Sequence, residues 1–326
     1  MLTKSILCLM MGFILSIILG IIIVPFFKKN HIGQKVSKKL NARHLLKEGT
    51  PTMGGFIFII STLLIILFLF LNKNIKFSYN FLIIIITFVF YGFLGFLDDF
   101  LKVKLHNNKG LSIILKFSLE LIICIIFFLL FLINGNNTIV NFYLFTIDLK
   151  IFYGFLILFM VTGCANAVNI TDGLDGLAAG LCTIAFISYG IIAFNSPYII
   201  GNDEIAIFCF ILSGSLLGFL TFNFYPAKIF MGDLGSLALG GVLSAVAITL
   251  KNEISLVIIG LVFIIETLSS FIQIISIRYF HKKIFLKSPL HHHFEMLGYK
   301  ETDIIKIFYA VGIFFSMIMI IYIIYH

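Results

Sequence analysis

Charge is the property that this sequence has least of. Only 12% of its 326 residues are Asp, Glu, Lys or Arg, whereas 60% are hydrophobic. A typical soluble domain is about 25% charged, so this chain has too little polar surface to cover a water-soluble globule. Composition therefore excludes a soluble enzyme and a disordered chain, and it predicts an all-α integral membrane protein.

Cysteine and arginine are also scarce. The five cysteines lie in apolar stretches and show neither a CxxC motif nor a His/Cys metal spacing, so we interpret them as small hydrophobic residues. Arg43 and Arg278 are the only arginines. If the protein binds phosphates, lysines, backbone amides and a metal ion must therefore do most of what guanidinium groups do elsewhere.

Long apolar runs are abundant, and each approaches the roughly 20 residues that a spanning helix needs. They predict a polytopic bundle of about ten transmembrane helices near residues 5–27, 52–71, 81–97, 112–133, 151–169, 177–194, 205–222, 234–250, 255–279 and 304–325. No repeat or soluble domain stands out. We therefore expect one transmembrane domain, 1–326.

The basic residues gather on one set of loops. Most of the 23 Lys and Arg residues lie in loops 28–50, 98–116, 171–176, 223–233 and 278–303. The positive-inside rule places these loops in the cytoplasm and both termini in the periplasm. The same rule explains the net charge of +8, so we expect no nucleic acid as a partner.

Five acids are not explained by topology. Asp98, Asp99, Asp172, Asp175 and Asp233 each lie within a few residues of a predicted membrane boundary, on the same face. Mg²⁺ prefers oxygen ligands and usually binds one or two carboxylates together with substrate phosphates. The cluster therefore predicts a magnesium site. The alternative for each acid is a helix cap or a pair with a nearby lysine.

The first acid motif, residues 95–102, closes the third predicted helix. Asp98 and Asp99 are adjacent and repel each other, which suits a metal ligand beside a proton acceptor. Lys102 follows at helical spacing, within reach of both. The alternative is an ordinary surface pair of acids with a lysine.

The second motif, residues 166–178, joins two predicted helices. Thr171 and Asp172 are expected to cap the second of them, and Gly173 and Gly176 allow close backbone approach. A helix N-terminus with unpaired N–H groups binds phosphate well. The motif therefore suggests a phosphate-binding turn.

The third motif, residues 222–236, precedes a helix rich in small residues. Asp233 is flanked by glycines, and Phe230 is a candidate surface for stacking a base. The helix after this motif pairs Gly240 with Ser244 and Gly241 with Ala245. These pairs predict close packing at the centre of the bundle.

Three consecutive histidines, 291–293, lie in the last basic loop, and we interpret them as protonatable hydrogen-bond donors to phosphate. A solvated polar stretch is the alternative.

Two acids lie inside apolar runs. Glu120 follows Lys116 by four residues, which predicts a helical ion pair. Glu266 has no such partner, so it is either a functional intramembrane acid or a hydrogen-bonded structural group.

Five blocks of sequence carry a family resemblance. They are Thr-Pro-Thr-Met-Gly-Gly (50–55), Leu-Asp-Asp-Phe-Leu-Lys (97–102), Asn-Ala-Val-Asn-Ile-Thr-Asp-Gly-Leu-Asp-Gly-Leu (166–177), Phe-Met-Gly-Asp-Leu-Gly-Ser-Leu (230–237) and Pro-Leu-His-His-His-Phe-Glu (289–295). In this order they resemble the phospho-N-acetylmuramoyl-pentapeptide transferases, a family within the polyprenyl-phosphate N-acetylhexosamine-1-phosphate transferase superfamily. The histidine block favours this family over its relatives that use GlcNAc.

The resemblance implies a reaction in the bacterial inner membrane. Phospho-MurNAc-pentapeptide would pass from UDP-MurNAc-pentapeptide to undecaprenyl phosphate, giving lipid I and UMP with Mg²⁺ as cofactor, at the cytoplasmic face. This is the first membrane step of peptidoglycan synthesis. The resemblance also implies a homodimer.

The resemblance further implies roles for individual residues. The catalytic set would be Asp98, Asp99, Asp233, His291 and His292, with Asp233, Asp98 and Asp99 as candidate metal ligands. Gly173, Leu174, Asp175 and Phe230 would form the uridine pocket. Other substrate-binding residues would be Lys47, Thr52, Lys102, Asn169, Asp172, Asn223 and His293.

Two alternatives remain open from the sequence. One is a sister enzyme that transfers GlcNAc-1-phosphate from UDP-GlcNAc to a polyprenyl phosphate. The other is a secondary transporter, for which Glu266 would be the evidence. Transporter sites lie near the bilayer midplane between repeats, whereas the acids here gather at one face and no inverted repeat is evident.

Overall fold

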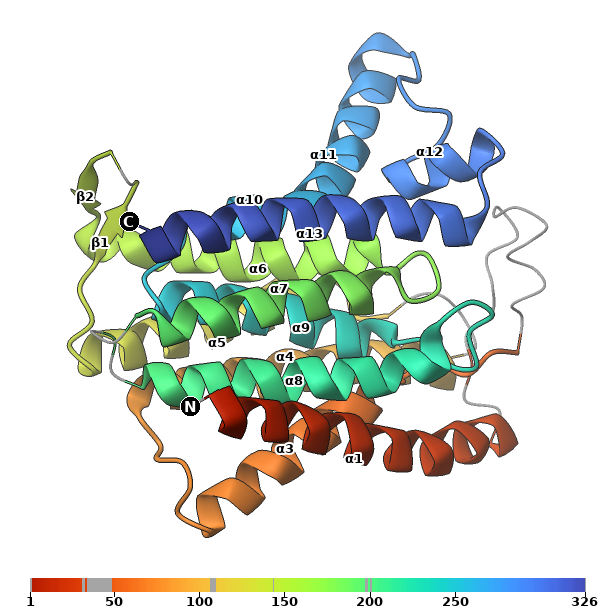
Figure 1. The fold of residues 1–326 in the computed structure, drawn as a ribbon. Helices are drawn as coiled ribbons and strands as arrows, with labels where there is room; N and C mark the ends of the chain where they lie inside the picture. The colour runs from red at the N-terminus through yellow and green to blue at the C-terminus, as the bar shows by residue number, and fades with distance from the viewer. Residues whose placement is uncertain are drawn as a thin grey trace.

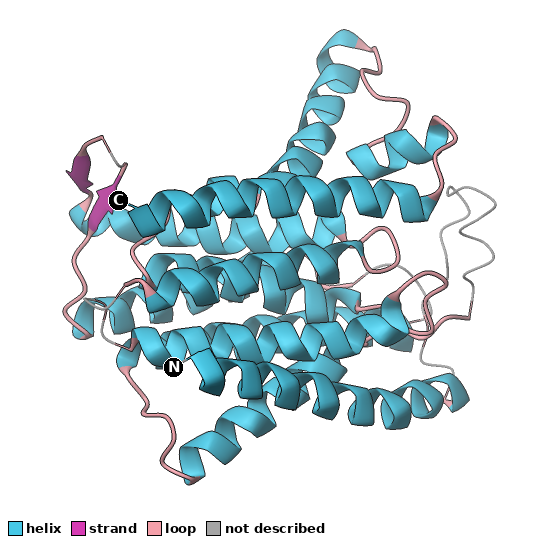
Figure 2. Cartoon of the chain, viewed as in Figure 1, coloured by secondary structure: helices cyan, strands magenta, loops and turns pink. Residues whose placement is uncertain are grey.

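The computed structural model describes residues 2–30, 33, 49–105, 110–142, 144–196, 199 and 201–325. This part of the chain is a helical bundle with one small β-hairpin (Figures 1 and 2). Its elements are α1 (Leu2–Lys29), α3 (Gly55–Leu71), α4 (Tyr79–Lys104), α5 (Ile113–Ile133), β1 (Ile139–Asn141), β2 (Thr146–Asp148), η1 (Lys150–Phe152), α6 (Tyr153–Thr171), α7 (Leu177–Phe194), α8 (Asn202–Asn223), α9 (Gly232–Thr249), α10 (Ser255–Ile259), α11 (Leu261–Ile275), η2 (Ser276–Phe280), α12 (Leu290–Met296) and α13 (Glu301–Tyr325).

The helices confirm a polytopic membrane protein. Within the described residues, nine helical segments are long and apolar enough to cross a membrane, and α3, with 17 residues, is a shorter apolar helix. Together they account for the ten predicted runs. Strands β1 and β2 pair antiparallel, with Val140 opposite Ile147.

The predicted run 255–279 differs from the structure because it is broken at Gly260. The short helix α10 ends there and α11 begins at the next residue. A Cβ atom at Gly260 would lie 2.6 Å from the Leu256 carbonyl oxygen, so the break accommodates glycine and no larger residue without a shift. After the break, α11 leans away from the other helices (Figure 1). Apolar content alone carries no signal of such a bend.

Helix α9 is the central helix of the bundle, and it packs against α3, α4, α6 and α7. Its small residues make this possible. A Cβ atom at Gly240 would lie 2.4 Å from the Cys164 carbonyl oxygen, and one at Gly241 would lie 2.8 Å from the Tyr91 ring. The predicted close packing of this helix is therefore confirmed, and it agrees with how helices associate in membranes.

The ends of the bundle differ in character. Helix α12, the α6–α7 turn and the α8–α9 turn gather at one end, whereas both termini and the β-hairpin lie toward the other (Figure 1). The acid motifs 95–102, 166–178 and 222–236 therefore meet at a single end of the bundle, which we call the acid end.

Candidate functional site

Two aspartates and one lysine form the core of the acid end. Lys102 Nζ lies 2.6 Å from Asp98 Oδ2 and 2.5 Å from Asp233 Oδ2. Asn169 Nδ2 donates to Asp233 Oδ1 at 2.7 Å and to Ser236 Oγ at 2.8 Å. The predicted reach of Lys102 to Asp98 along the helix is thus confirmed. The lysine also joins α4 to α9, and Asn169 joins α6 to α9.

Glycine allows α4 and α9 to approach this closely. A Cβ atom at Gly95 would lie 2.1 Å from the Asp233 carbonyl oxygen. Gly232, which opens α9, has a φ of +76°, a conformation that L side chains rarely adopt. A Cβ atom there would also meet Asp99 and Thr52. These close approaches bring Asp98, Asp99 and Thr52 beside the start of α9.

Asp98 and Asp99 have different surroundings. Asp99 is fully buried, and its Oδ2 accepts a hydrogen bond from the Leu234 N–H at 3.0 Å, in the first turn of α9. A carboxylate there complements the partial positive charge of a helix N-terminus. Asp98 is 5% exposed; its Oδ1 accepts from the Leu111 N–H at 2.7 Å, while its Oδ2 binds Lys102. Asp98 is thus the carboxylate that shares the lysine with Asp233.

The Thr-Pro-Thr-Met-Gly-Gly block pairs with the segment before α9. The Phe230 N–H donates to the Pro51 carbonyl at 2.8 Å, and the Gly54 N–H donates to the Phe230 carbonyl at 2.8 Å. Thr52 is buried by this pairing, and Phe230 is half-buried. Two blocks about 180 residues apart in sequence therefore form one wall of the site.

The α6–α7 turn is held by contacts that the sequence does not reveal. The Asp175 carboxylate accepts from the Ala227 N–H at 2.9 Å, and the Asp175 N–H donates to Glu301 Oε1 at 2.7 Å. Tyr309 donates its hydroxyl proton to the Gly176 carbonyl at 2.6 Å. Glu301 and Tyr309 both belong to α13, so the last helix fixes the turn.

The predicted capping of α7 is wrong. Gly176, with a φ of +85°, occupies the N-cap position, and no side chain caps this helix. Thr171 instead donates back to the Ala167 carbonyl at 2.8 Å, one turn earlier in α6. Asp172 ends α6 rather than beginning α7. The residues between Asp172 and Gly176 lengthen the turn beyond what capping by Thr171 or Asp172 would allow.

Asp172 is electrostatically unusual. Burial, followed by the negative charges of Asp233, Asp99 and Asp175, raises its pKa to about 8. A carboxyl group in this state is protonated at neutral pH and can donate a hydrogen bond. Asp172 therefore has different surroundings from Asp98 and Asp233, which pair with Lys102.

The three histidines have three different partners. His291 Nδ1 lies 2.8 Å from Glu266 Oε2, and His292 Nδ1 lies 2.6 Å from Glu295 Oε2. Burial lowers the pKa of His292. His293 Nδ1 accepts from the Leu286 N–H at 3.2 Å. The His293 Nδ1 atom thus supports the loop before α12, and the expectation that all three histidines line one site stays a prediction.

The remaining residues predicted for the site either stabilise neighbouring segments of the fold or lie outside the described residues. Lys47 is among the latter. Asn223 is buried and donates to the Ile229 carbonyl at 2.9 Å, so it stabilises the α8–α9 turn. Leu174 is buried and Gly173 is partly exposed. The predicted Lys116–Glu120 ion pair is wrong as a direct contact, because these two described residues form none. The Lys116 charge still acts on the buried Glu120 carboxylate from a distance, and the Asn166 side chain donates to the Thr162 carbonyl at 2.8 Å.

The carboxylates suit a hard cation in chemistry, but a lysine ammonium lies between two of them. Among the residues that the structure describes, no group of three His, Cys, Asp or Glu side chains is placed to hold a metal ion. Mg²⁺ needs only one or two protein carboxylates when phosphates complete its shell. Asp98 and Asp233, which already share one cation, fit that requirement.

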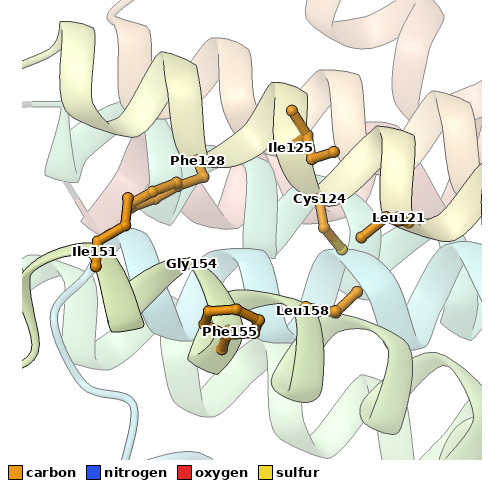
Figure 3. Close-up of a pocket in the computed structure, with 8 residues that line it drawn as sticks. All are labelled: Leu121, Cys124, Ile125, Phe128, Ile151, Gly154, Phe155 and Leu158. Atoms are coloured by element: carbon orange, nitrogen blue, oxygen red, sulfur yellow. The ribbon is translucent and has the colours of Figure 1, made fainter.

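An apolar pocket elsewhere in the molecule has a different character. It lies between α5 and α6 and is lined by carbon and one thiol (Figure 3), namely Leu121, Cys124, Ile125, Phe128, Ile151, Gly154, Phe155 and Leu158. None of these residues can bind a phosphate or a sugar through a charged group. The pocket therefore does not compete with the acid end as the site of chemistry.

Comparison with known proteins gives a consistent result. Residues 81–251 match the model of glycosyl transferase family 4. A phospho-N-acetylmuramoyl-pentapeptide-transferase from Geobacillus thermodenitrificans is 42% identical over 309 residues, which cover 94% of each chain. Proteins of the same name from Halalkalibacterium halodurans and Staphylococcus aureus are 43% and 39% identical over 316 and 314 residues, covering at least 95% of each chain. The chain belongs to the phospho-N-acetylmuramoyl-pentapeptide transferase family.

Membership of the phospho-N-acetylmuramoyl-pentapeptide transferase family confirms the resemblance drawn from the five blocks. It also identifies the chain as a phosphoglycosyl transferase of a bacterial membrane. The residues that sequence reasoning missed are Glu301, Tyr309 and Ser236, each of which holds a neighbour of the acid end. Only Ser236 had a local signal, because it lies within one of the blocks.

Proposed function

We propose that this protein transfers phospho-MurNAc-pentapeptide from UDP-MurNAc-pentapeptide to undecaprenyl phosphate, giving lipid I and UMP. The observation that carries the proposal is the Asp98–Lys102–Asp233 cluster at one end of a bundle that belongs to this transferase family. One substrate is a soluble anion and the other is a lipid phosphate. A site at the membrane edge is where the two can meet.

Lys102 and the aspartates would have different roles in the reaction, because their charges are opposite. Phosphoryl transfer needs positioning and charge neutralisation more than covalent chemistry. Lys102 would bind the substrate phosphates, since its ammonium has three donors and the two carboxylates use two of them. Asp98 would orient the lipid phosphate, and Asp233 would keep Lys102 and Asn169 in place. Asp99 would hold the start of α9 through Leu234.

The remaining predicted residues would bind the sugar nucleotide. Gly173, Leu174, Asp175 and Phe230 would form the uridine pocket, with Phe230 stacking on the base. Thr52, Asn169, Asp172 and Lys47 would lie nearby. Asn223, Asp175 and His293 would act through the backbone segments that they hold. His291 and His292 would face the reacting groups.

We also propose Mg²⁺ as the cofactor, held by Asp233 with Asp98 or Asp99. When bound, it would neutralise charge on the diphosphate. The donor set supports this, because carboxylates are the ligands that Mg²⁺ prefers. Lys102 would then exchange a carboxylate for a phosphate oxygen.

The basic loops would place the acid end in the cytoplasm and both termini in the periplasm. The chain would act as a single transmembrane domain and assemble as a homodimer. A cysteine introduced near Lys38 would then resist labelling by a membrane-impermeant reagent in intact cells. Labelling there would contradict the orientation.

The proposed reaction is tested with purified protein, undecaprenyl phosphate and radiolabelled UDP donors. We expect label from UDP-MurNAc-pentapeptide in the lipid, equimolar UMP, loss of both in EDTA and recovery with added Mg²⁺. Transfer from UDP-GlcNAc alone would reassign the enzyme to the sister activity. Exchange of labelled UMP into the donor without any lipid would contradict direct attack by the lipid phosphate and indicate a covalent enzyme intermediate.

A further inference from the structure

A buried carboxylate inside the bundle holds the first histidine of α12. Glu266, in the leaning helix α11, makes two polar contacts with His291. Its Oε1 accepts from the His291 backbone N–H at 3.1 Å, and its Oε2 lies 2.8 Å from the His291 Nδ1. Both side chains are 1% exposed. Glu266 thus binds His291 through both its backbone N–H group and its imidazole ring.

These two contacts determine which ring nitrogen of His291 carries a proton. An ionised carboxylate can only accept hydrogen bonds, so the short contact to Oε2 requires a proton on His291 Nδ1. The opposite nitrogen, Nε2, is then the atom that remains for chemistry. A histidine held through one nitrogen by a carboxylate presents the other in a fixed direction.

The second nitrogen points toward the acid end. His291 Nε2 is buried and has no hydrogen-bond partner within the described part of the chain. A Cβ atom at Gly173 would lie 2.3 Å from it. Gly173 therefore leaves open the space in front of Nε2, next to Asp172 in the α6–α7 turn. A buried nitrogen without a partner indicates a position that a ligand group completes.

We propose that Glu266 is a positioning residue, which fixes the tautomer and direction of His291 so that the unprotonated Nε2 accepts a hydrogen bond from an O–H or N–H group of the sugar nucleotide beside Gly173. This inference rests on the proposed function for the identity of the ligand. The state of the ring does not depend on it. Glu266 acts through His291 and does not itself touch the substrate.

The substitution Glu266→Gln reverses the arrangement without changing its size. The backbone N–H of His291 still requires an acceptor, so the amide oxygen occupies the Oε1 position. The amide NH₂ group then faces Nδ1 and donates to it. His291 must accept at Nδ1 and carry its proton on Nε2. The atom that faces the substrate site would therefore change its hydrogen-bonding character.

The experiment combines a spectroscopic and a kinetic measurement on the full chain in lipid nanodiscs. Ring-¹⁵N histidine spectra of the protein and of Glu266→Gln are recorded, with His291→Gln to assign the His291 signals. We expect a protonated Nδ1 in the unsubstituted protein and a protonated Nε2 with unprotonated Nδ1 in Glu266→Gln. Transfer by Glu266→Gln should fall about 100-fold or more, as wrong-tautomer variants of other carboxylate–histidine pairs do.

The double variant separates positioning from mere support of the fold. Glu266→Gln combined with His291→Gln should be no slower than His291→Gln alone, because both changes remove one function. Thr267→Val is the control at the neighbouring position on α11, where the Thr267 hydroxyl donates to the Phe263 carbonyl within the same helix. It should stay within threefold of the unsubstituted enzyme. Should Glu266→Gln not fold, Glu266→Asp and the spectrum of the unsubstituted protein are used instead.

Two results would overturn the inference. One is an unprotonated Nδ1 on His291 in the unsubstituted protein, or a tautomer that Glu266→Gln leaves unchanged. The other is a rate for Glu266→Gln within threefold of normal, or losses that multiply in the double variant. If the spectra agree with expectation but the unsubstituted protein transfers nothing from UDP-MurNAc-pentapeptide, the proposed function fails and the positioning of His291 stands.

Discussion

Two lysine–carboxylate clusters lie at opposite ends of the same bundle, and their surroundings differ. At the acid end, Lys102 lies within 2.6 Å of Asp98 and Asp233. At the other end, Lys251 lies 3.0 Å from Glu253 and donates to the Tyr153 hydroxyl at 2.9 Å and the Asn137 carbonyl at 3.2 Å. Tyr153 in turn donates its hydroxyl proton to Glu253. The rings of Tyr153 and Phe131 lie 4.4 and 5.5 Å from the Lys251 ammonium.

These surroundings distinguish a structural ion pair from a reactive one. All three protons of Lys251 have acceptors, two aromatic rings cover it, and the Glu253 side chain is only 2% exposed. Lys102 is shared by two carboxylates on different helices, and the Asp233 side chain is 17% exposed. A closed cluster stabilises the fold, whereas an open one can exchange a carboxylate for an incoming phosphate. We therefore expect the two ends to respond oppositely to substitution.

The largest effect on catalysis should come from Asp233→Asn. It removes a charge that binds Lys102 and that a bound cation needs, so transfer should fall about 1000-fold.

Asp98→Asn is the matched variant at the same lysine. It should keep more activity, about 1% of normal, and its rate should improve as pH rises, because the lipid phosphate has a second pKa near 6 and ionises without help. Initial rates between about pH 6 and 8.5 test both; an equal loss with no pH dependence would contradict the division of roles.

Phe230→Ala should have an intermediate and selective effect. Stacking of a base on an aromatic ring contributes roughly 1–3 kcal/mol, which corresponds to an increase of about 5- to 150-fold in the KM for the UDP donor. The KM for undecaprenyl phosphate should change little. Phe224, an exposed aromatic residue in the same turn, provides the control, and Phe224→Ala should leave both values near normal. An increase confined to the lipid KM would reassign Phe230 to acyl-chain packing.

The smallest effect concerns the pH dependence of stability. The pKa of Asp172 is raised to about 8 in the folded protein, whereas an unfolded aspartate titrates near 4. Between these values the folded state binds more protons, so the stability that Asp172 contributes is lost as pH rises from about 4 to about 8. Asp172→Asn should flatten this slope in metal-free thermal unfolding. An unchanged slope would show that Asp172 is already ionised at neutral pH.

Periodicity and local spacing were enough to predict the spanning helices and one contact of the site. The apolar runs indicated the helices, and the spacing of Asp98 and Lys102 predicted that these two side chains meet. The common face of the acid motifs came from counting spans. These inferences succeed because membrane helices must satisfy their own backbone and so keep a simple register.

Contacts between distant segments could not be predicted in this way. Glu266 and His291 lie 25 residues apart, and Asp175 and Glu301 lie 126 apart. Neither pair has a spacing that identifies it. Glu120 illustrates the opposite error, because its helical spacing to Lys116 suggested a direct ion pair that the two side chains do not form, although the Lys116 charge still acts on Glu120. Tertiary packing decides which of several reachable partners a polar side chain meets.

The most direct measurement compares Lys102→Met with Lys251→Met, scoring lipid product and thermal unfolding in the same preparations. Removing Lys251 leaves the buried Glu253 charge without its cation, a loss of about 3–5 kcal/mol for a buried pair, yet the surviving folded protein should transfer at a normal rate. Removing Lys102 should reduce transfer at least about 100-fold and change the unfolding temperature far less. Sustained activity in Lys102→Met would contradict the assignment of the acid end as the reactive cluster, as would loss of transfer in a folded Lys251→Met.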